Sequence, residues 1–178
     1  MNILPGNMRF GARQPVKRLE DQRLLTGKGR FVDDQSTDGA LWLYLLRSPH
    51  AHARILSIDT EAARAEPGVV AIFTGDDLVA DQIGTLQTRA IFKRPDGTDM
   101  VVPARRLLAH EVVRFVGEPV AAAVAKSRSE AQTAAEAIMV DYDILEAITD
   151  PIAALEPDAP RVYADAPDNV AAAMSYGD

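Results

Sequence analysis

The three histidines are the first candidates for chemistry, because the imidazole ring is the commonest metal ligand in proteins. His50 and His52 alternate along a segment that we expect to be extended, so their side chains would share one face, a spacing that some zinc sites use. His110 is the only other histidine in the sequence. Three histidines do not favour a complete ligand set, and we expect them to pack at the entrance of a strand.

The glycines at residues 27–29 flank a lysine and could form a phosphate-binding loop. The dinucleotide pattern G-x-G-x-x-G would place its third glycine at Val32, and the Walker pattern needs glycine where Gln22 stands. The Walker pattern also needs Ser or Thr directly after Lys28, but Gly29 follows it. These mismatches predict a tight turn here.

Two acidic segments could bind a cation or act as an acid or base. Residues 34–39 match the opening of a calcium loop, but the twelfth position, which must supply a bidentate carboxylate, is Leu45. We therefore expect a plain polar loop. Glu118 lies between Gly117 and Pro119 at a predicted tight turn beside a buried strand, and we expect it to be a solvated turn residue.

Nucleophiles with a recognisable motif are absent from the sequence. There is no G-x-S-x-G pattern, and Lys126 lies in Val-Ala-Lys-Ser instead of between the methionines of a biotin carrier. The chain has no cysteine, which excludes disulfides, thiolate nucleophiles and an iron–sulfur cluster held by this chain. We therefore assign no catalytic, cofactor-binding or metal-binding residue, and any redox centre must lie elsewhere.

The charge and apolar patterns exclude two classes of partner. The 26 acidic and 19 basic residues give a net charge of −7, and the basic residues are scattered, which does not favour binding to nucleic acid. The longest apolar runs, such as 120–125, are far shorter than the roughly 20 residues of a membrane-spanning helix. Residues 1–10 lack the apolar core of a secretory signal, so we expect a cytoplasmic protein.

The elements that must position these residues form an α+β pattern. Short helices are predicted at 60–65, after residue 74 and from 128, a turn is predicted at 95–97, and strands are predicted at 41–46, 53–58, 69–73, 112–115, 120–125 and 139–144. Leu56 and Ile58 should share one strand face. The two strand, helix, strand stretches, 53–73 and 120–144, predict a mixed sheet with two related β-α-β-like units.

Local signals specify how the helices begin and pack. Capping boxes are predicted at Thr74 with Asp77 and at Ser127 with Glu130, and Thr60 should cap the first helix of the domain. The helix after Ser127 carries small residues with helical periodicity, which predicts one narrow face packed closely on a sheet; that face comprises Ala131, Ala134, Ala135 and Ile138.

Changes in composition divide the chain into three parts. We expect an N-terminal arm at residues 1–30, an α/β domain at 31–155, and an extended linker at 156–178 that is rich in proline and aspartate. The sequence ends at Gly177-Asp178 without a closing element, which favours a chain cut inside a longer protein.

Several blocks of residues together resemble a known family. They occupy about residues 15–155 and read Arg-Leu-Glu-Asp at 18–21, Leu-Leu-Thr-Gly-Lys-Gly-Arg-Phe at 24–31, Asp-Asp at 33–34, Arg-Ser-Pro-His-Ala-His-Ala-Arg-Ile at 47–55, Ala-Glu-Pro-Gly-Val-Val-Ala at 65–71, Val-Arg-Phe-Val-Gly-Glu-Pro-Val-Ala-Ala-Ala-Val-Ala at 113–125, the alanines after 130, and Val-Asp-Tyr at 140–142. In this order and spacing they resemble the α/β hammerhead domain that opens the large subunit of molybdenum hydroxylases, the family of xanthine dehydrogenase, aldehyde oxidase and carbon monoxide dehydrogenase.

The resemblance implies both a fold and an enzyme. Such enzymes hydroxylate carbon centres, such as aldehydes and N-heterocycles, or oxidise carbon monoxide, at molybdenum held by a pterin cofactor and with water as the oxygen source. Their electrons leave through iron–sulfur clusters and FAD. The family's cofactor loops and its general-base glutamate lie downstream of the hammerhead domain, and nothing in this sequence matches them.

The resemblance therefore implies a scaffold domain that is inactive alone. The start at Met1, directly before the hammerhead, resembles the bacterial arrangement with separate FAD-binding medium and iron–sulfur small subunits. The substrate is not specified, because the substrate-selecting loops lie downstream. A free-standing scaffold or assembly module without chemistry of its own is the alternative, and the two differ in whether the gene continues with cofactor loops beyond Asp178.

Overall fold

The computed structural model describes residues 18–35, 38–88 and 92–177, and the chain divides into two units, Met1–Gly39 and Ala40–Asp178. The first unit contains helix α1 (Asp21–Leu25) and the 3₁₀ turn η1 (Val32–Asp34). Helix α1 ends at Leu25 and is capped by Thr26; the next residue, Gly27, has a φ of +69°, the left-handed conformation that glycine adopts most easily. A turn is present at residues 26–27, so the turn predicted at 27–29 is confirmed only at Gly27, and the predicted loop at 34–39 lies partly outside the described residues.

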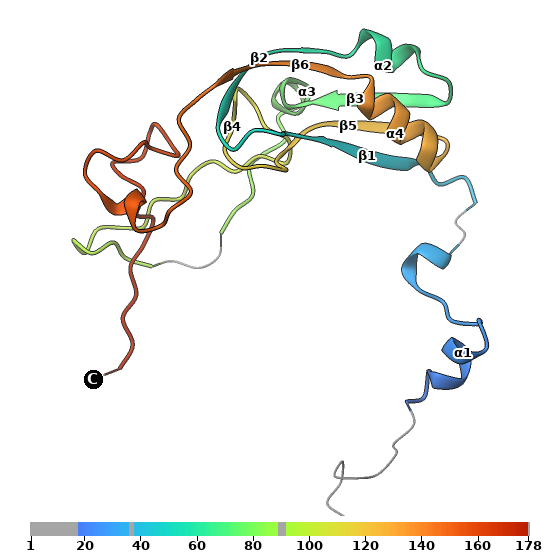
Figure 1. The fold of residues 1–178 in the computed structure, drawn as a ribbon, viewed down its shortest axis with the longest axis horizontal. Helices are drawn as coiled ribbons and strands as arrows, with labels where there is room; N and C mark the ends of the chain where they lie inside the picture. Colours follow the sequence, from blue (N-terminus) through green and yellow to red (C-terminus); the bar gives the residue numbers. More distant parts are fainter. Residues whose placement is uncertain (1–17, 36–37, 89–91, 178) are drawn as a thin grey trace, which may run out of the picture. The chain divides into compact units, whose positions relative to one another are not determined.

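The second unit consists of two three-stranded sheets and short helices (Figure 1). The first sheet has the order β1-β5-β3, formed by Trp42–Arg47, Pro119–Ala125 and Val69–Thr74. The second has the order β4-β2-β6, formed by Val112–Val113, Ala53–Asp59 and Met139–Ile144. The helical elements are α2 (Glu61–Ala65), α3 (Gly75–Ala80), α4 (Arg128–Glu136) and the 3₁₀ turn η2 (Ala153–Leu155).

This arrangement confirms the α+β class and corrects one detail of the expected sheet. All strand pairings among the described residues are antiparallel, so the sheet is not mixed. Each strand, helix, strand unit instead connects the two sheets: β2-α2-β3 passes from the second sheet to the first, and β5-α4-β6 returns. Parallel neighbours within one sheet need a crossover of about a dozen or more residues. The connection at residues 60–68 is shorter than that.

The core of the second unit is built largely from alanine. Ala134 of α4 is 0% exposed and packs with Ala63 of α2 and with Ala123 of β5. The predicted small-residue face is confirmed, because Ala131, Ala134 and Ala135 of α4 are buried, as is Ile138 just beyond the end of the helix. A second buried cluster, which contains Val113 and Val120, joins β4 to β5. None of the helices among the described residues combines the length and the apolar character that crossing a membrane requires.

A β-bulge changes the predicted face of β2. The pairing with β6 shifts register between Ile55 and Ser57, so that Leu56 is 57% exposed. Ile55 and Ile58 are the residues that pack against the core clusters. The prediction that Leu56 and Ile58 share a face is therefore wrong, because an extra residue in one strand reverses the alternation of side chains beyond it.

The helix caps agree only partly with the sequence. At α3 the full capping box is present: the Thr74 amide donates to Asp77 Oδ2 at 2.7 Å, and Thr74 Oγ1 accepts from the Asp77 amide at 3.4 Å. At α4, Ser127 Oγ accepts from the Glu130 amide at 3.3 Å. However, the Glu130 carboxylate bonds to the Ser127 hydroxyl at 2.8 Å, so only half of that box is formed.

The cap predicted for α2 is wrong. Thr60 makes no capping hydrogen bond, and its hydroxyl instead accepts from Arg64 Nε at 3.0 Å. The preceding residue supplies the cap, because Asp59 Oδ1 accepts from the Glu61 amide at 2.9 Å. A carboxylate at this end also suits the positive end of the helix dipole.

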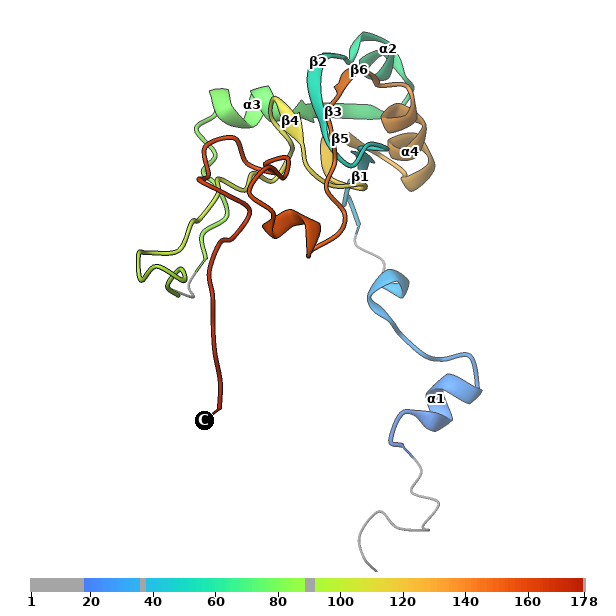
Figure 2. The same cartoon turned by 60° about the vertical axis from the view of Figure 1, so that its left-hand side comes forward.

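Two irregular segments lie side by side next to the sheets (Figure 2). One is residues 92–105, drawn yellow-green, and the other is residues 156–177, drawn red. We call the second segment the tail. It contains no helix or strand among its described residues, and it belongs to the same unit as residues 40–155.

Candidate functional site

The turn before β5 is held by hydrogen bonds on both sides. Gly117 has a φ of +89°, its amide donates to Ser48 O at 2.8 Å, and the Ser48 amide donates to Glu118 O at 2.9 Å. The Glu118 carboxylate accepts from the Arg114 amide at 2.5 Å. Glu118 is therefore an anchor of the turn, and it has the polar partner that a freely solvated residue lacks. The same bond ends β4 at Val113, which corrects the predicted strand at 112–115.

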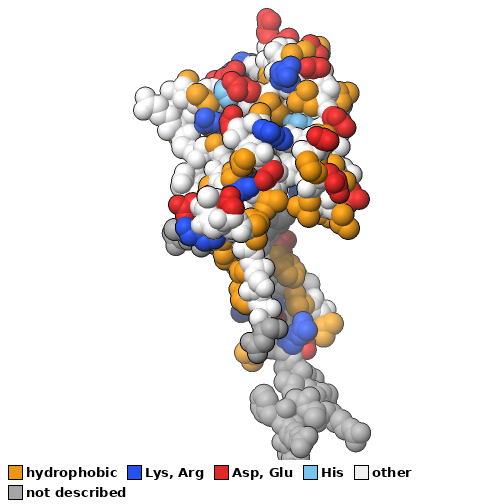
Figure 3. Space-filling view, turned by 90° about the vertical axis from the view of Figure 1, so that its left-hand side faces the viewer, with side chains coloured by type: hydrophobic (Ala, Val, Ile, Leu, Met, Phe, Trp, Pro, Cys, Tyr) orange, Lys and Arg blue, Asp and Glu red, His pale blue; other side chains and the backbone are white. Residues whose placement is uncertain are grey.

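A polar hollow of about 260 Å³ lies next to this turn. Its lining comes from residues 104–118 and from the start of the tail, and its charged or titratable members are Arg105, Arg106, His110, Glu111, Arg114, Glu118, Tyr163 and Asp165. Three arginines face three carboxylates, so the lining has no strong preference for an anion or a cation. The face of the molecule shown in Figure 3 likewise carries interspersed acidic and basic side chains.

Arg114 is the side chain that joins this hollow to the tail. Its Nε donates to Val162 O at 3.2 Å, its guanidinium also donates to Val112 O at 3.1 Å, and it lies over the ring of Tyr163, 4.5 Å from the centroid. Such a cation–π contact and two backbone bonds fix the guanidinium in place. Arg114 therefore positions the tail through its bond to Val162 and its contact with Tyr163.

Each of the three histidines contacts a different residue. The ring of His50 packs edge-on against Tyr142 at 4.9 Å, His52 Nδ1 bonds to Glu146 O at 2.7 Å, and His110 Nε2 lies 3.3 Å from Asp76 Oδ1. Burial raises the pKa of Tyr142, and a hydrogen bond with Ser48 partly opposes that rise. Within residues 18–35, 38–88 and 92–177, no three His, Asp or Glu side chains are grouped so as to hold a metal ion.

The turn predicted at 95–97 is confirmed and organises the loop opposite the tail. The Arg94 amide donates to Thr98 O at 2.9 Å, and Gly97 has a φ of +83°. The Asp96 carboxylate accepts from the Thr98 hydroxyl at 2.6 Å and from its amide at 3.0 Å. These two bonds lower the pKa of Asp96, because they stabilise its ionised form.

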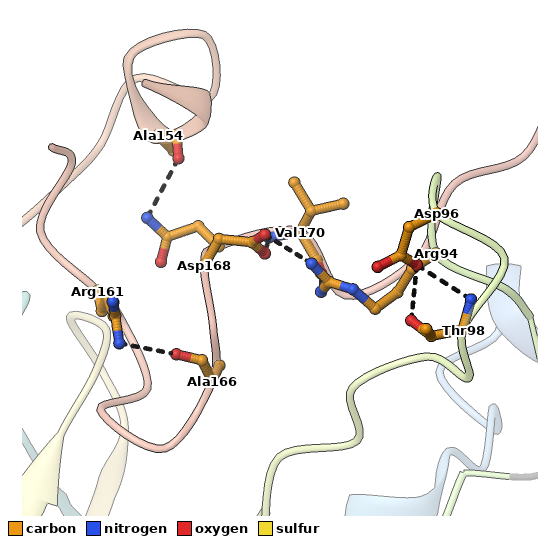
Figure 4. A network of polar contacts seen from close by, with 9 residues as sticks. Arg94, Asp96, Thr98, Ala154, Arg161, Ala166, Asp168 and Val170 are labelled. Atoms are coloured by element: carbon orange, nitrogen blue, oxygen red, sulfur yellow. Dashed lines mark hydrogen bonds and ion pairs between the residues drawn. The ribbon is translucent and has the colours of Figure 1, made fainter. Parts of the chain in front are cut away.

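An ion pair joins this loop to the tail (Figure 4). Arg94, whose side chain is only 9% exposed, bonds to Asp168 Oδ2 at 2.6 Å and also donates to the carbonyl of Val170. Backbone bonds continue the contact, from Val101 to Ala171 O at 3.0 Å. The bond from Arg94, followed by one from the Val170 amide, lowers the pKa of Asp168.

Hydrogen bonds of the Asn169 side chain connect separate parts of the tail and attach the tail to η2. Its amide nitrogen donates to Ala154 O at 3.2 Å and to Pro160 O at 3.0 Å, and its Oδ1 accepts from the Val162 amide at 3.0 Å. The tail is therefore irregular, and it is tied by side-chain and backbone bonds to the domain that precedes it. The division of the chain at residues 30 and 155 stays a prediction.

No buried polar side chain of the described residues is left to bind a cofactor. In the part of the chain that the structure describes, every buried side-chain nitrogen or oxygen atom has a hydrogen-bond partner. We therefore derive no chemical step through such a group from this chain.

Comparison with known proteins agrees with this arrangement. Residues 26–146 match the family model described as aldehyde oxidase and xanthine dehydrogenase, a/b hammerhead domain. The carbon monoxide dehydrogenase large chain of Afipia carboxidovorans is 41% identical over 157 residues, which is 88% of this chain and 18% of that protein. The nicotine 6-hydroxylase large subunit of Paenarthrobacter nicotinovorans is 39% identical over 92% of this chain and 19% of its own length.

A solved structure shows the same fold. The quinoline 2-oxidoreductase of Pseudomonas putida 86 superposes with a TM-score of 0.74 and 42% sequence identity, over 88% of this chain and 19% of the other. The chain thus spans less than a fifth of the relatives it matches. The family model covers well over half of the present sequence. The chain therefore belongs to the aldehyde oxidase and xanthine dehydrogenase family, of which it carries the hammerhead domain.

Proposed function

We propose that this chain is the N-terminal scaffold domain of the large, molybdopterin-binding subunit of a bacterial molybdenum hydroxylase. The observation that carries the proposal is the alignment of 88–92% of the chain with 18–19% of large subunits that act on carbon monoxide or nicotine. The enzyme would oxidise carbon monoxide, an aldehyde or an N-heterocycle with water as the oxygen source.

The internal construction of the domain supports a scaffold role. Among the described residues, the buried side-chain nitrogen and oxygen atoms have hydrogen-bond partners, the histidines lie apart, and the polar hollow has equal numbers of arginines and carboxylates in its lining. Chemistry of the molybdenum centre would come from the rest of the subunit. Partner subunits would carry FAD and the iron–sulfur clusters, as the resemblance to the family's bacterial arrangement implies. The same proposal places the enzyme in the cytoplasm.

The test compares the chain alone with the chain joined to the rest of a large subunit. Residues 1–178 are expressed in a host that makes the pterin cofactor, molybdenum is measured by mass spectrometry, and dye reduction is assayed with aldehydes, purines and carbon monoxide. We expect neither metal nor turnover from the chain alone, and both when the remainder is fused to it. Stoichiometric molybdenum in the chain alone would contradict the scaffold role, and a gene that stops after Asp178 would favour a free-standing module.

A further inference from the structure

The two faces of the first sheet differ in what covers them. One face packs on α2 and α4, through Ile72, Ala121 and Ala123. Residues paired directly across antiparallel strands lie on the same side of a sheet. The register therefore places two rows of side chains on the other face, which we call the open face: Leu45, Ala122 and Phe73, and next to them Leu43, Val124 and Ala71.

The open face is apolar and accessible. Leu43 is 58% exposed and Phe73 is 39% exposed, whereas Ala122, between two larger neighbours, is nearly buried. No member of the open face is charged or polar. The exposed members lie on the two outer strands, β1 and β3, and half-buried apolar residues of the same face lie between and beside them. An apolar surface of this kind differs from the single exposed apolar residues found on most surfaces, and we interpret it as an interaction site.

A groove extends this surface around the free edge of β1. It has a volume of about 550 Å³ and is lined by residues 43–47, Ala135 and Glu136. Among the described residues, no strand pairs with this edge. An edge of this kind offers backbone donors and acceptors that proteins ordinarily cover. The open face and the groove together can therefore accept one docking element along the whole of β1.

We propose that the remainder of the large subunit docks on the open face and the adjoining edge of β1. The inference rests on the proposed function. The chain covers 18–19% of its relatives, so 81–82% of their length belongs to the same polypeptide. Permanent interfaces are apolar like a core, whereas transient ones keep more polar groups, and the open face has the first character. The remainder of the large subunit is covalently linked to this domain and is therefore held at high local concentration beside it, which favours this occupant over the medium or small subunit.

Single cysteines can test the proposal, because this chain has none of its own. The present sequence replaces the matching segment of the Afipia carboxidovorans large chain, and Leu43→Cys or Phe73→Cys is introduced. Maleimide labelling of that peptide is followed by mass spectrometry, with the same protein unfolded in urea as the reference. Leu56→Cys is the matched control, because Leu56 is 57% exposed but lies on β2, in the other sheet.

We expect both open-face thiols to be labelled at least about tenfold more slowly than in urea, and the Leu56→Cys thiol to be labelled faster than either. Fast labelling of the open-face thiols in a folded chimera would overturn the proposal. Protection that appears only after the medium and small subunits are added, or only at high concentration of the chimera, would assign the face to those subunits or to a second copy. If the chimera does not fold even without an introduced cysteine, this result would instead contradict the proposed function.

Discussion

Replacing Ala134 by leucine should destabilise the second unit by about 1–3 kcal/mol, because the added methyl and methylene groups have no free space to enter. Ala134 is 0% exposed, and its neighbours on α2, β3 and β5 are themselves buried. The larger side chain must therefore push α4 away from the sheet or adopt a strained rotamer. For a chain of 150–250 residues, that loss lowers the Tm by roughly 2–12 °C.

The assay is urea or thermal unfolding followed by circular dichroism and by fluorescence of Trp42, the only tryptophan. Thr133→Leu on the same helix is the matched control, because Thr133 is exposed. We expect that variant to unfold within about 0.5 kcal/mol of the parent. An Ala134→Leu protein with an unchanged midpoint would refute the packing of α4 on the sheet.

Three further results are expected. Because the pKa of Asp168 is lowered in the folded protein, its bond with Arg94 should stabilise the tail above pH about 4 and be lost as the pH falls through the lowered pKa; hydrogen exchange of the tail should show this loss, and Asp168→Asn should abolish the pH dependence. Asn169→Ala removes three hydrogen bonds, so limited proteolysis should cut the tail sooner than in the parent, and equal rates would count against this anchor. Gly75→Ala places a Cβ 2.2 Å from a backbone carbonyl oxygen and should cost roughly 1–3 kcal/mol in urea unfolding, whereas Gly84→Ala, which meets nothing within 4 Å, should not destabilise.

The features that the sequence predicts well depend on near neighbours in the chain. The buried face of α4 and the capping box at Thr74 involve residues within about two helical turns, so their periodicity and residue types are sufficient. The buried run of β5 is recognisable because both of its faces are apolar. The family blocks add the hammerhead fold, which residue patterns alone leave as one of several α+β arrangements.

The features that the sequence does not predict depend on partners that are distant in the chain. The bulge at Leu56 arises in the pairing of β2 with β6, and no periodicity within β2 reveals it. Arg94 and Asp168 are 74 residues apart, and both lie in segments with weak secondary-structure signals. The polar hollow likewise joins residues 104–118 to the start of the tail. Glycine at 117 indicates the turn, but only the structure identifies the Arg114 amide as the partner of Glu118.

Both strand, helix, strand units connect the two sheets, and this connectivity delays folding during synthesis on the ribosome. β1 pairs with β5, and β2 pairs with β4 and β6, so neither sheet can close until the later strands have emerged. At about 5–20 residues per second, roughly 4–15 s separate the translation of β1 from that of β5. During this time the apolar residues of β1 have no partner strand, so folding of this unit waits for its C-terminal half and the nascent chain depends on protection until then.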